Sequence, residues 1–162
     1  EIILRPKKIS SDNSTDYQMI MHAIKNINYK FEYIAHIRPT TPLRKISDLK
    51  SSIRTFVKSN EDSLRSVHEM SESSYKSVEI IRKKLKSLKN LKLNMDQLNN
   101  PRQLFNKTYT PNGVIDIYKK DFIMNHKRLF GDNVRGFVTS YTHEIDNIND
   151  FKYIEFLCQK KL

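Results

Sequence analysis

The chain has 162 residues, and its 29 Lys and Arg against 18 Asp and Glu give a formal net charge of +11 at pH 7. This is the length of one domain, and a compact domain of this size buries about 70% of the surface that its unfolded chain exposes. The single cysteine, Cys158, excludes an internal disulfide and with it the disulfide-scaffold class of secreted proteins. No apolar run reaches the ~18 residues of a membrane span, and the start lacks the layout of a signal peptide. We therefore expect a soluble cytoplasmic protein with no membrane partner.

The positive charge is compatible with a polyanionic partner such as nucleic acid, but it is spread along the chain. Its one dense cluster is a run of six basic residues between Arg82 and Lys92. A solvated amphipathic segment explains this cluster better than a nucleic-acid patch, because no aromatic residues are interleaved for base stacking. A basic nucleic-acid-binding module remains an alternative function. Four leucines lie within this basic segment or directly after it: Leu85, Leu88, Leu91 and Leu93.

Apolar periodicity predicts strands that alternate with amphipathic helices. In the first half we expect a strand at 2–4 ended by Pro6, a helix capped by Ser14 or Thr15 with apolar residues from 17 to 27, a strand at 33–37, and a helix capped by Ser47 that reaches 57. In the second half we expect strands at 64–70 and 75–81, the basic segment, a polar loop at 94–107, a strand at 113–118, a helix at 121–129, a strand at 134–139, and a last helix capped by Asn149.

This alternation predicts an α/β fold, a Rossmann-like layered architecture with a largely parallel sheet. The segments 34–37, 114–117 and 134–138 are expected at its centre, because apolar β-branched residues suit strands that are covered on both faces. In such a fold the ligand site lies at the carboxyl ends of the strands. Polar clusters that directly follow the predicted strands are therefore candidate site residues.

The segment RPTTPLR, residues 38–44, places two guanidinium groups and two hydroxyls on a turn that Pro39 and Pro42 stiffen. Such a turn suits an anion, because the planar fork of Arg matches phosphate or carboxylate and a rigid loop loses little freedom on binding. A structural turn in which Arg44 covers a helix end explains the same residues equally well.

Glu144 and Asp146 stand two residues apart, so in an extended segment both carboxylates leave the same face, about 7 Å apart at the backbone. A pair of converging carboxylates suits Mg²⁺, which bridges to the phosphates of a substrate. An exposed acidic loop that complements the dipole of the following helix is the alternative. The five histidines and Cys158 show no metal-ligand spacing, and no serine has the flanking glycines of a nucleophile elbow.

Five blocks of the sequence form an ordered series: LRPKKISSDNSTDYQMIMHAI, YIAHIRPTTPLR, DSLRSVHEMSESSYKSVEI, PRQLFNKTYTPNGVIDIY and YTHEIDNINDFKYIEF. Taken in this order, they resemble the acylneuraminate cytidylyltransferase family, which includes the synthetases of CMP-sialic, CMP-legionaminic and CMP-pseudaminic acids. The resemblance runs from Ile3 to about Leu157, and its specific blocks are RPTTPLR and RQ…Y.PNG…DI. It implies the nucleotide-diphospho-sugar transferase type of fold. It also implies an enzyme that activates a nonulosonic, sialic-acid-like sugar with CTP and Mg²⁺ to the CMP-sugar and pyrophosphate, for surface glycan biosynthesis.

The resemblance also implies roles for individual residues. On the nucleotide side and in the turn, the implied substrate-binding residues are Arg5 beside the cytosine, Thr15 near the nucleotide, Arg38 facing the sugar, Thr40 and Arg44. The implied lining of the acyl-sugar pocket is Lys76, Arg102, Gln103, Tyr109 and Asn112, with Arg102 on the sugar carboxylate. Glu144 and Asp146 match the acidic pair that holds the metal, and Asp146 and Arg102 are the expected catalytic residues. Three departures from the family pattern are Glu144 for a frequent Asp, Ser73–Ser74 for a frequent His-Pro, and Asn106 for a frequent Pro.

Family members begin with a strand and a Gly-rich basic loop that wraps the CTP phosphates. The 162 residues contain only Gly113, Gly131 and Gly136 and no such loop. We therefore expect an N-terminally incomplete chain, the C-terminal two-thirds of a single cytidylyltransferase domain, with residues 83–100 as an excursion that joins a homodimer. By itself it should not turn over CTP, because Mg²⁺ does not replace the backbone N–H groups of the loop. A non-catalytic truncated remnant is the alternative.

Overall fold

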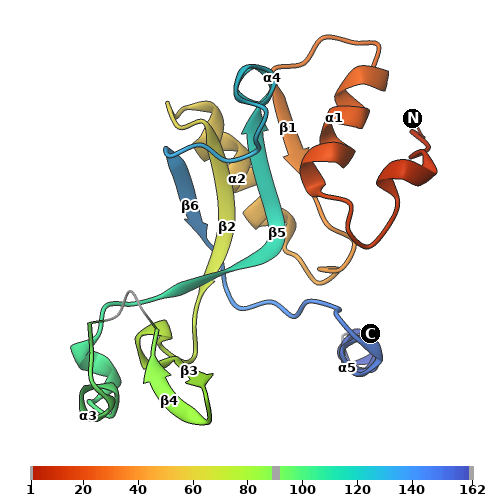
Figure 1. Ribbon diagram of the computed structural model, residues 1–162. Coiled ribbons are helices and arrows are strands. Elements are labelled where there is room, and N and C mark those ends of the chain that lie inside the picture. The colour runs from red at the N-terminus through yellow and green to blue at the C-terminus, as the bar shows by residue number, and fades with distance from the viewer. Residues whose placement is uncertain (1, 89–91, 161–162) are drawn as a thin grey trace. The chain divides into compact units, whose positions relative to one another are not determined.

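The computed structural model describes residues 2–88 and 92–160 (Figure 1). Its contacts divide the chain into two compact units. The first unit comprises Glu1–Arg38, Lys45–Arg65 and Ile115–Phe137, and the second comprises Pro39–Arg44, Ser66–Val114 and Val138–Leu162. No helix of the described residues is both long and apolar enough to cross a membrane.

Helices and strands alternate along much of the chain, as the periodicity predicted. The helices are η1 (Lys7–Ile9), α1 (Asp16–Asn26), α2 (Ile46–Val57), η2 (Ser74–Lys76), α3 (Met95–Leu98), η3 (Arg102–Leu104), α4 (Lys120–His126) and α5 (Ile148–Gln159). The strands are β1 (Tyr33–His36), β2 (Ser63–Glu69), β3 (Val78–Ile81), β4 (Lys84–Ser87), β5 (Tyr109–Lys119) and β6 (Val134–Val138). The protein is therefore α/β, as expected.

Four strands form one sheet in the order β1-β5-β2-β6, and β3 and β4 form a separate hairpin. β5 runs antiparallel to β1, with His36 opposite Asp116. It also runs antiparallel to β2, because the Lys119 N–H donates to Asp62 at one end and the Met70 N–H to Thr108 at the other. β2 and β6 run parallel, because the Asp62 N–H donates to Asn133 near one end and the Thr139 N–H to Val67 near the other. The expectation of a largely parallel sheet is thus corrected to a mixed sheet.

The strand order confirms one of the three segments expected at the centre of the sheet, 114–117 in β5, and corrects the other two. β5 and β2 lie inside, whereas β1 and β6 have a neighbour on one side only among the described strands. Ile37 after β1 and Val134 and Val138 in β6 are correspondingly exposed. Their β-branched side chains fit an edge strand as well as a central one, so composition alone did not separate the two positions.

The core of the first unit lies between α1 and the strands. Ile20 and Ile24 of α1 pack with Tyr118 of β5 and Ile123 of α4, and all four side chains are buried. Thr15 fixes the start of α1 through a capping box, in which its hydroxyl accepts from the Gln18 N–H and the Gln18 side chain accepts from the Thr15 N–H. This helix and its cap agree with the sequence prediction.

The hairpin of the second unit was expected only in part. Residues 75–81 divide into the end of η2 and β3, and the basic segment supplies β4 rather than a simple amphipathic stretch. The two strands are joined by Arg82 and Lys83, both with positive φ, 50° and 64°. Such a turn normally carries Asn-Gly, so Arg-Lys gives no hairpin signal. The polar loop at 94–107 contains α3 and η3.

Three further details differ from the predictions. Residues 2–4 form no strand, and Ile2 and Leu4 are exposed rather than buried, so a short apolar run was misleading there. Lys45, not Ser47, precedes α2. Asn147, not Asn149, caps α5, because its side chain accepts from the N–H groups of Asn149 and Asp150.

Candidate functional site

The second unit joins the 39–44 turn to the acidic segment. The Thr40 hydroxyl donates to a carboxylate oxygen of Glu144 at 3.2 Å, and the Ile145 N–H donates to the Thr40 carbonyl at 2.8 Å. Two segments selected from the sequence for separate reasons are thus adjacent. Glu144 is half-buried at this junction, whereas Asp146 is exposed.

Asn112 belongs to the same junction. The Thr41 hydroxyl, which is buried, donates to the Asn112 carbonyl at 3.4 Å. The Asn112 amide donates to the Thr139 hydroxyl at 2.7 Å and accepts from the Val114 N–H at 3.3 Å. The side chain is buried with both ends of its amide engaged, so it fixes the shape of the junction. The segment PNG lies within β5 rather than in a turn.

The acidic pair provides two carboxylates, which is the donor set that Mg²⁺ usually takes from a protein when the remaining ligands are waters and substrate phosphates. Glu144 already accepts a hydrogen bond from Thr40, which orients its carboxylate. No group of three or more His, Cys, Asp or Glu that could cage a metal occurs in residues 2–88 and 92–160. The two carboxylates alone do not cage a metal, so a cation bound there would take its other ligands from water or substrate phosphates.

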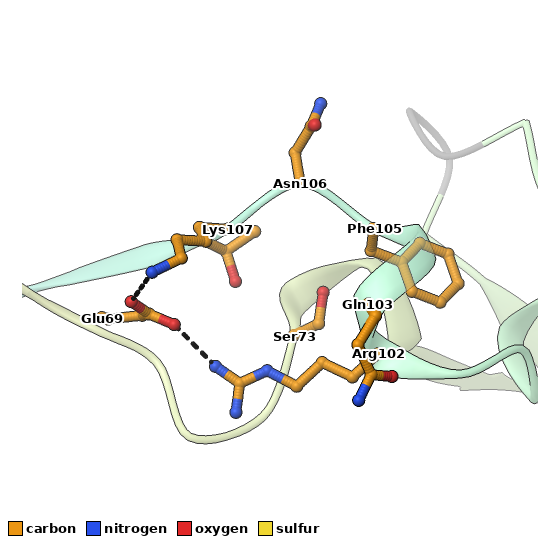
Figure 2. Close-up of a pocket in the computed structure, with 8 residues that line it drawn as sticks. Glu69, Ser73, Arg102, Gln103, Phe105, Asn106 and Lys107 are labelled. Carbon is orange, nitrogen blue, oxygen red and sulfur yellow. Dashed lines mark hydrogen bonds and ion pairs between the residues drawn. The ribbon is translucent and has the colours of Figure 1, made fainter.

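Arg102 and Gln103 line a pocket of about 590 Å³ in the second unit (Figure 2). Arg102 donates to the carbonyls of Ser71 at 2.7 Å and Met70 at 2.8 Å, and to a Glu69 carboxylate oxygen at 3.0 Å. The Lys107 ammonium donates to the other Glu69 oxygen at 2.8 Å. The remaining lining residues are Ser73, Phe105, Asn106 and Thr108.

Aromatic side chains stand beside this pocket. Tyr75 stacks on Phe105 with ring centroids 5.8 Å apart, and the Lys76 ammonium lies 5.8 Å from the Phe105 ring. Lys76 therefore lies on η2 against an aromatic ring, and not on the strand that the sequence predicted. Tyr109, at the start of β5, is exposed.

Three predicted residues belong to the first unit. Arg38 pairs with Asp16 and with the buried Asp116. Thr15 caps α1, and its hydroxyl accepts a hydrogen bond from the Gln18 N–H. Arg5 is exposed. In the second unit, Arg44 is half-buried, and burial lowers the pKa of its guanidinium.

Glu69, Lys107 and Asp116 were not predicted from the sequence. Asp116 had a usable signal, because a carboxylate inside the apolar strand VIDIY is costly to bury unless it is paired. Glu69 stands at the end of β2, where site residues are expected, but a single acid in a polar stretch carries no pattern. Lys107 was one of many dispersed lysines.

Comparisons with known proteins agree with this architecture. No protein-family model matches the chain. It is 24% identical over 164 residues to post-translational flagellin modification protein B of Campylobacter coli, and the alignment covers 97% of this chain and 67% of that protein. The structure matches that of CMP:2-keto-3-deoxy-manno-octonic acid synthetase complexed with CTP, with a TM-score of 0.63 and 13% identity, over 93% of this chain and 70% of the other.

The structural match shows that this chain shares the α/β fold of that synthetase. The chain is therefore similar in fold to a CMP-sugar synthetase and, at 24% identity, similar in sequence to the flagellin modification protein. The resemblance to the acylneuraminate cytidylyltransferase family is thereby confirmed.

Proposed function

We propose that this chain carries the sugar-binding and metal-binding part of a cytidylyltransferase that activates a nonulosonic acid with CTP. The observation that supports this most directly is the junction of the 39–44 turn with the acidic segment, through Thr40 and Glu144. Both segments belong to blocks that carry the resemblance, and Thr40 and Glu144 are 104 residues apart in the sequence. Their hydrogen bond joins the turn to a carboxylate that the resemblance assigns to the metal.

In the proposed reaction the anomeric hydroxyl oxygen of the sugar attacks the α-phosphorus of CTP. The new bond joins that oxygen to phosphorus, the bond between the α-phosphorus and the bridging oxygen breaks, and pyrophosphate leaves. The hydroxyl proton passes to solvent. The protein contributes by positioning the reactants and stabilising charge, as in phosphoryl transfer generally.

Within this reaction Arg102 binds the sugar carboxylate, because a guanidinium fork matches two carboxylate oxygens. Gln103 lines the same pocket and offers an amide to sugar hydroxyls. Glu144 and Asp146 would hold Mg²⁺, which when bound offsets the negative charge of the triphosphate. Thr40 keeps the Glu144 carboxylate oriented through the hydrogen bond described above.

Two further proposals concern the whole assembly. The 162 residues hold no Gly-rich phosphate loop, so we propose that turnover requires such a segment in addition to this chain. The segment 83–100 is proposed to contact a second subunit, because Leu85 on β4 is exposed. Leu88 and Leu93 are half-buried, and Leu91 lies outside the described residues.

The function is tested first by binding, which does not need the phosphate loop. Calorimetry of the chain with N-acetylneuraminic, legionaminic and pseudaminic acids should show binding that the corresponding methyl esters lose. Turnover is then followed as pyrophosphate release with CTP, ATP, GTP and UTP, using the chain joined to a Gly-rich phosphate-binding segment. Failure of every sugar acid to bind would exclude the proposed sugar site.

A further inference from the structure

The pocket beside Arg102 contains a shared carboxylate that the proposed reaction does not use. One carboxylate oxygen of Glu69 accepts from the Arg102 guanidinium at 3.0 Å, and the other accepts from the Lys107 ammonium at 2.8 Å (Figure 2). These three are the charged residues of the pocket lining. Two cations therefore share one internal anion, which leaves a single excess positive charge.

The position of Arg102 does not depend on Glu69 alone. Its guanidinium also donates to the carbonyls of Met70 and Ser71, at 2.8 and 2.7 Å. That turn is itself held to Thr108, whose carbonyl accepts from the Met70 N–H at 2.9 Å and whose hydroxyl accepts from the Ser74 N–H at 3.1 Å. The guanidinium can therefore keep its place when Glu69 moves away.

The contacts with Glu69 are weak enough to be exchanged. The side chains of Arg102, Glu69 and Lys107 are 49%, 37% and 69% exposed, so water and salt screen both ion pairs. Exposed pairs of this kind change an equilibrium constant by about 1.5- to 5-fold. An incoming carboxylate can replace Glu69 without a large penalty, because it restores the same charge-assisted hydrogen bonds.

We propose that Glu69 is an exchangeable internal counter-ion, which occupies Arg102 and Lys107 in the free protein and yields both cations to the carboxylate of the sugar acid. This inference rests on the proposed function and deepens it. Glu69 and Lys107 become specificity-determining residues: a neutral sugar offers no carboxylate to replace Glu69, so it gains neither cation.

The test compares the binding of N-acetylneuraminic acid and its methyl ester to the full chain by calorimetry at low ionic strength. Glu69→Gln removes the competing charge and should tighten binding of the acid about two- to fivefold, with the ester unchanged. Lys107→Met should weaken binding of the acid by a similar factor. Glu72→Gln is the matched control, because it removes the same charge from an exposed residue of the same turn that does not line the pocket.

Weaker binding of the acid by Glu69→Gln would overturn the inference, since Glu69 would then be holding Arg102 in place. Equal tightening in Glu72→Gln would overturn it as well, because the effect would then reflect net charge alone. Both outcomes leave the proposed function standing, as the unmodified chain still binds the acid. Absence of binding by the unmodified chain, shown to be folded by circular dichroism, would overturn the proposed function and this inference with it.

Discussion

The guanidinium of Arg38 lies 3.4 Å from the carboxylate of Asp116, whose side chain is only 4% exposed. Arg65 stands 3.7 Å from the other oxygen of this carboxylate, and Asp16 pairs with Arg38 from α1. Burial raises the pKa of Asp116, while Arg65 and Arg38 oppose that rise. Arg38, predicted to face the sugar, is thus held by two carboxylates in the first unit.

We expect Asp116→Ala to lower the free energy of unfolding by about 3 kcal/mol, because it leaves two half-buried guanidinium groups without their shared carboxylate. Asp16→Ala should cost no more than about 1 kcal/mol, since Asp16 is far more exposed. Urea denaturation of both variants measures the difference. Equal losses in the two variants would show that burial of Asp116 does not govern this cluster.

The elements that bury one face were predictable, because burial imposes a period on the sequence. Ile20 and Ile24 mark α1 in this way, and the helix starts at Thr15, one of its two expected caps. The turn at Arg82 and Lys83 was not predictable, since both residues adopt a conformation that their side chains disfavour. The position of β1 at the edge of the sheet depends on strand order, which local periodicity does not encode.

The same distinction applies to the site. The chemistry of Thr40 and Glu144 could be read from their segments, but their hydrogen bond depends on how those distant segments fold together. Arg102 was expected to meet a carboxylate, and the structure supplies one from the protein itself, Glu69. A pairing between a single Glu and a single Arg 33 residues later leaves no local pattern.

Stability should depend on pH through two histidines. Burial lowers the pKa of His36, and the positive charge of Arg38 lowers it further; burial also lowers the pKa of His68. The unfolded chain, with an ordinary pKa near 6.5, therefore takes up protons before the folded chain does as the pH falls. The free energy of unfolding should keep its highest value at a pH above this ordinary pKa and should decrease as the pH falls below it.

Urea denaturation at pH 7.5, 6.5 and 5.5 measures this dependence. The variants His36→Gln and His68→Gln should each flatten the slope between these values. A free energy of unfolding that rises on acidification would contradict the direction of both pKa shifts.

The β3–β4 hairpin should contribute to a homodimer. Ile80 and Leu85 stand opposite each other in the register, and their side chains are 75% and 54% exposed, so they form an uncovered apolar pair. Leu85→Glu should weaken self-association at least tenfold, since it removes apolar area worth about 1.5–3 kcal/mol when buried and introduces a charge. Sedimentation equilibrium measures this. Lys86→Gln, at the next position of β4, is the control, and a Leu85→Glu variant that associates as strongly as the unmodified chain would exclude the hairpin from the interface.

Arg102→Lys should mainly raise KM for the sugar acid, because one ammonium cannot make the paired contact of a guanidinium.

Asp146 is the carboxylate on which metal-dependent chemistry should depend most. It is exposed, whereas Glu144 is half-buried and engaged with Thr40, so Asp146 is the better placed to bridge a cation to a triphosphate. Asp146→Asn keeps the shape of the side chain and removes its charge. We expect it to reduce Mg²⁺-dependent pyrophosphate release at least a hundredfold, about 2.7 kcal/mol, in the chain joined to a phosphate-binding segment. Glu155→Gln on α5 removes the same charge from an exposed position and should leave the rate unchanged. Calorimetry with Mn²⁺ and CTP separates lost metal binding from lost chemistry, and full activity in the Asp146→Asn variant would show that the metal is held elsewhere.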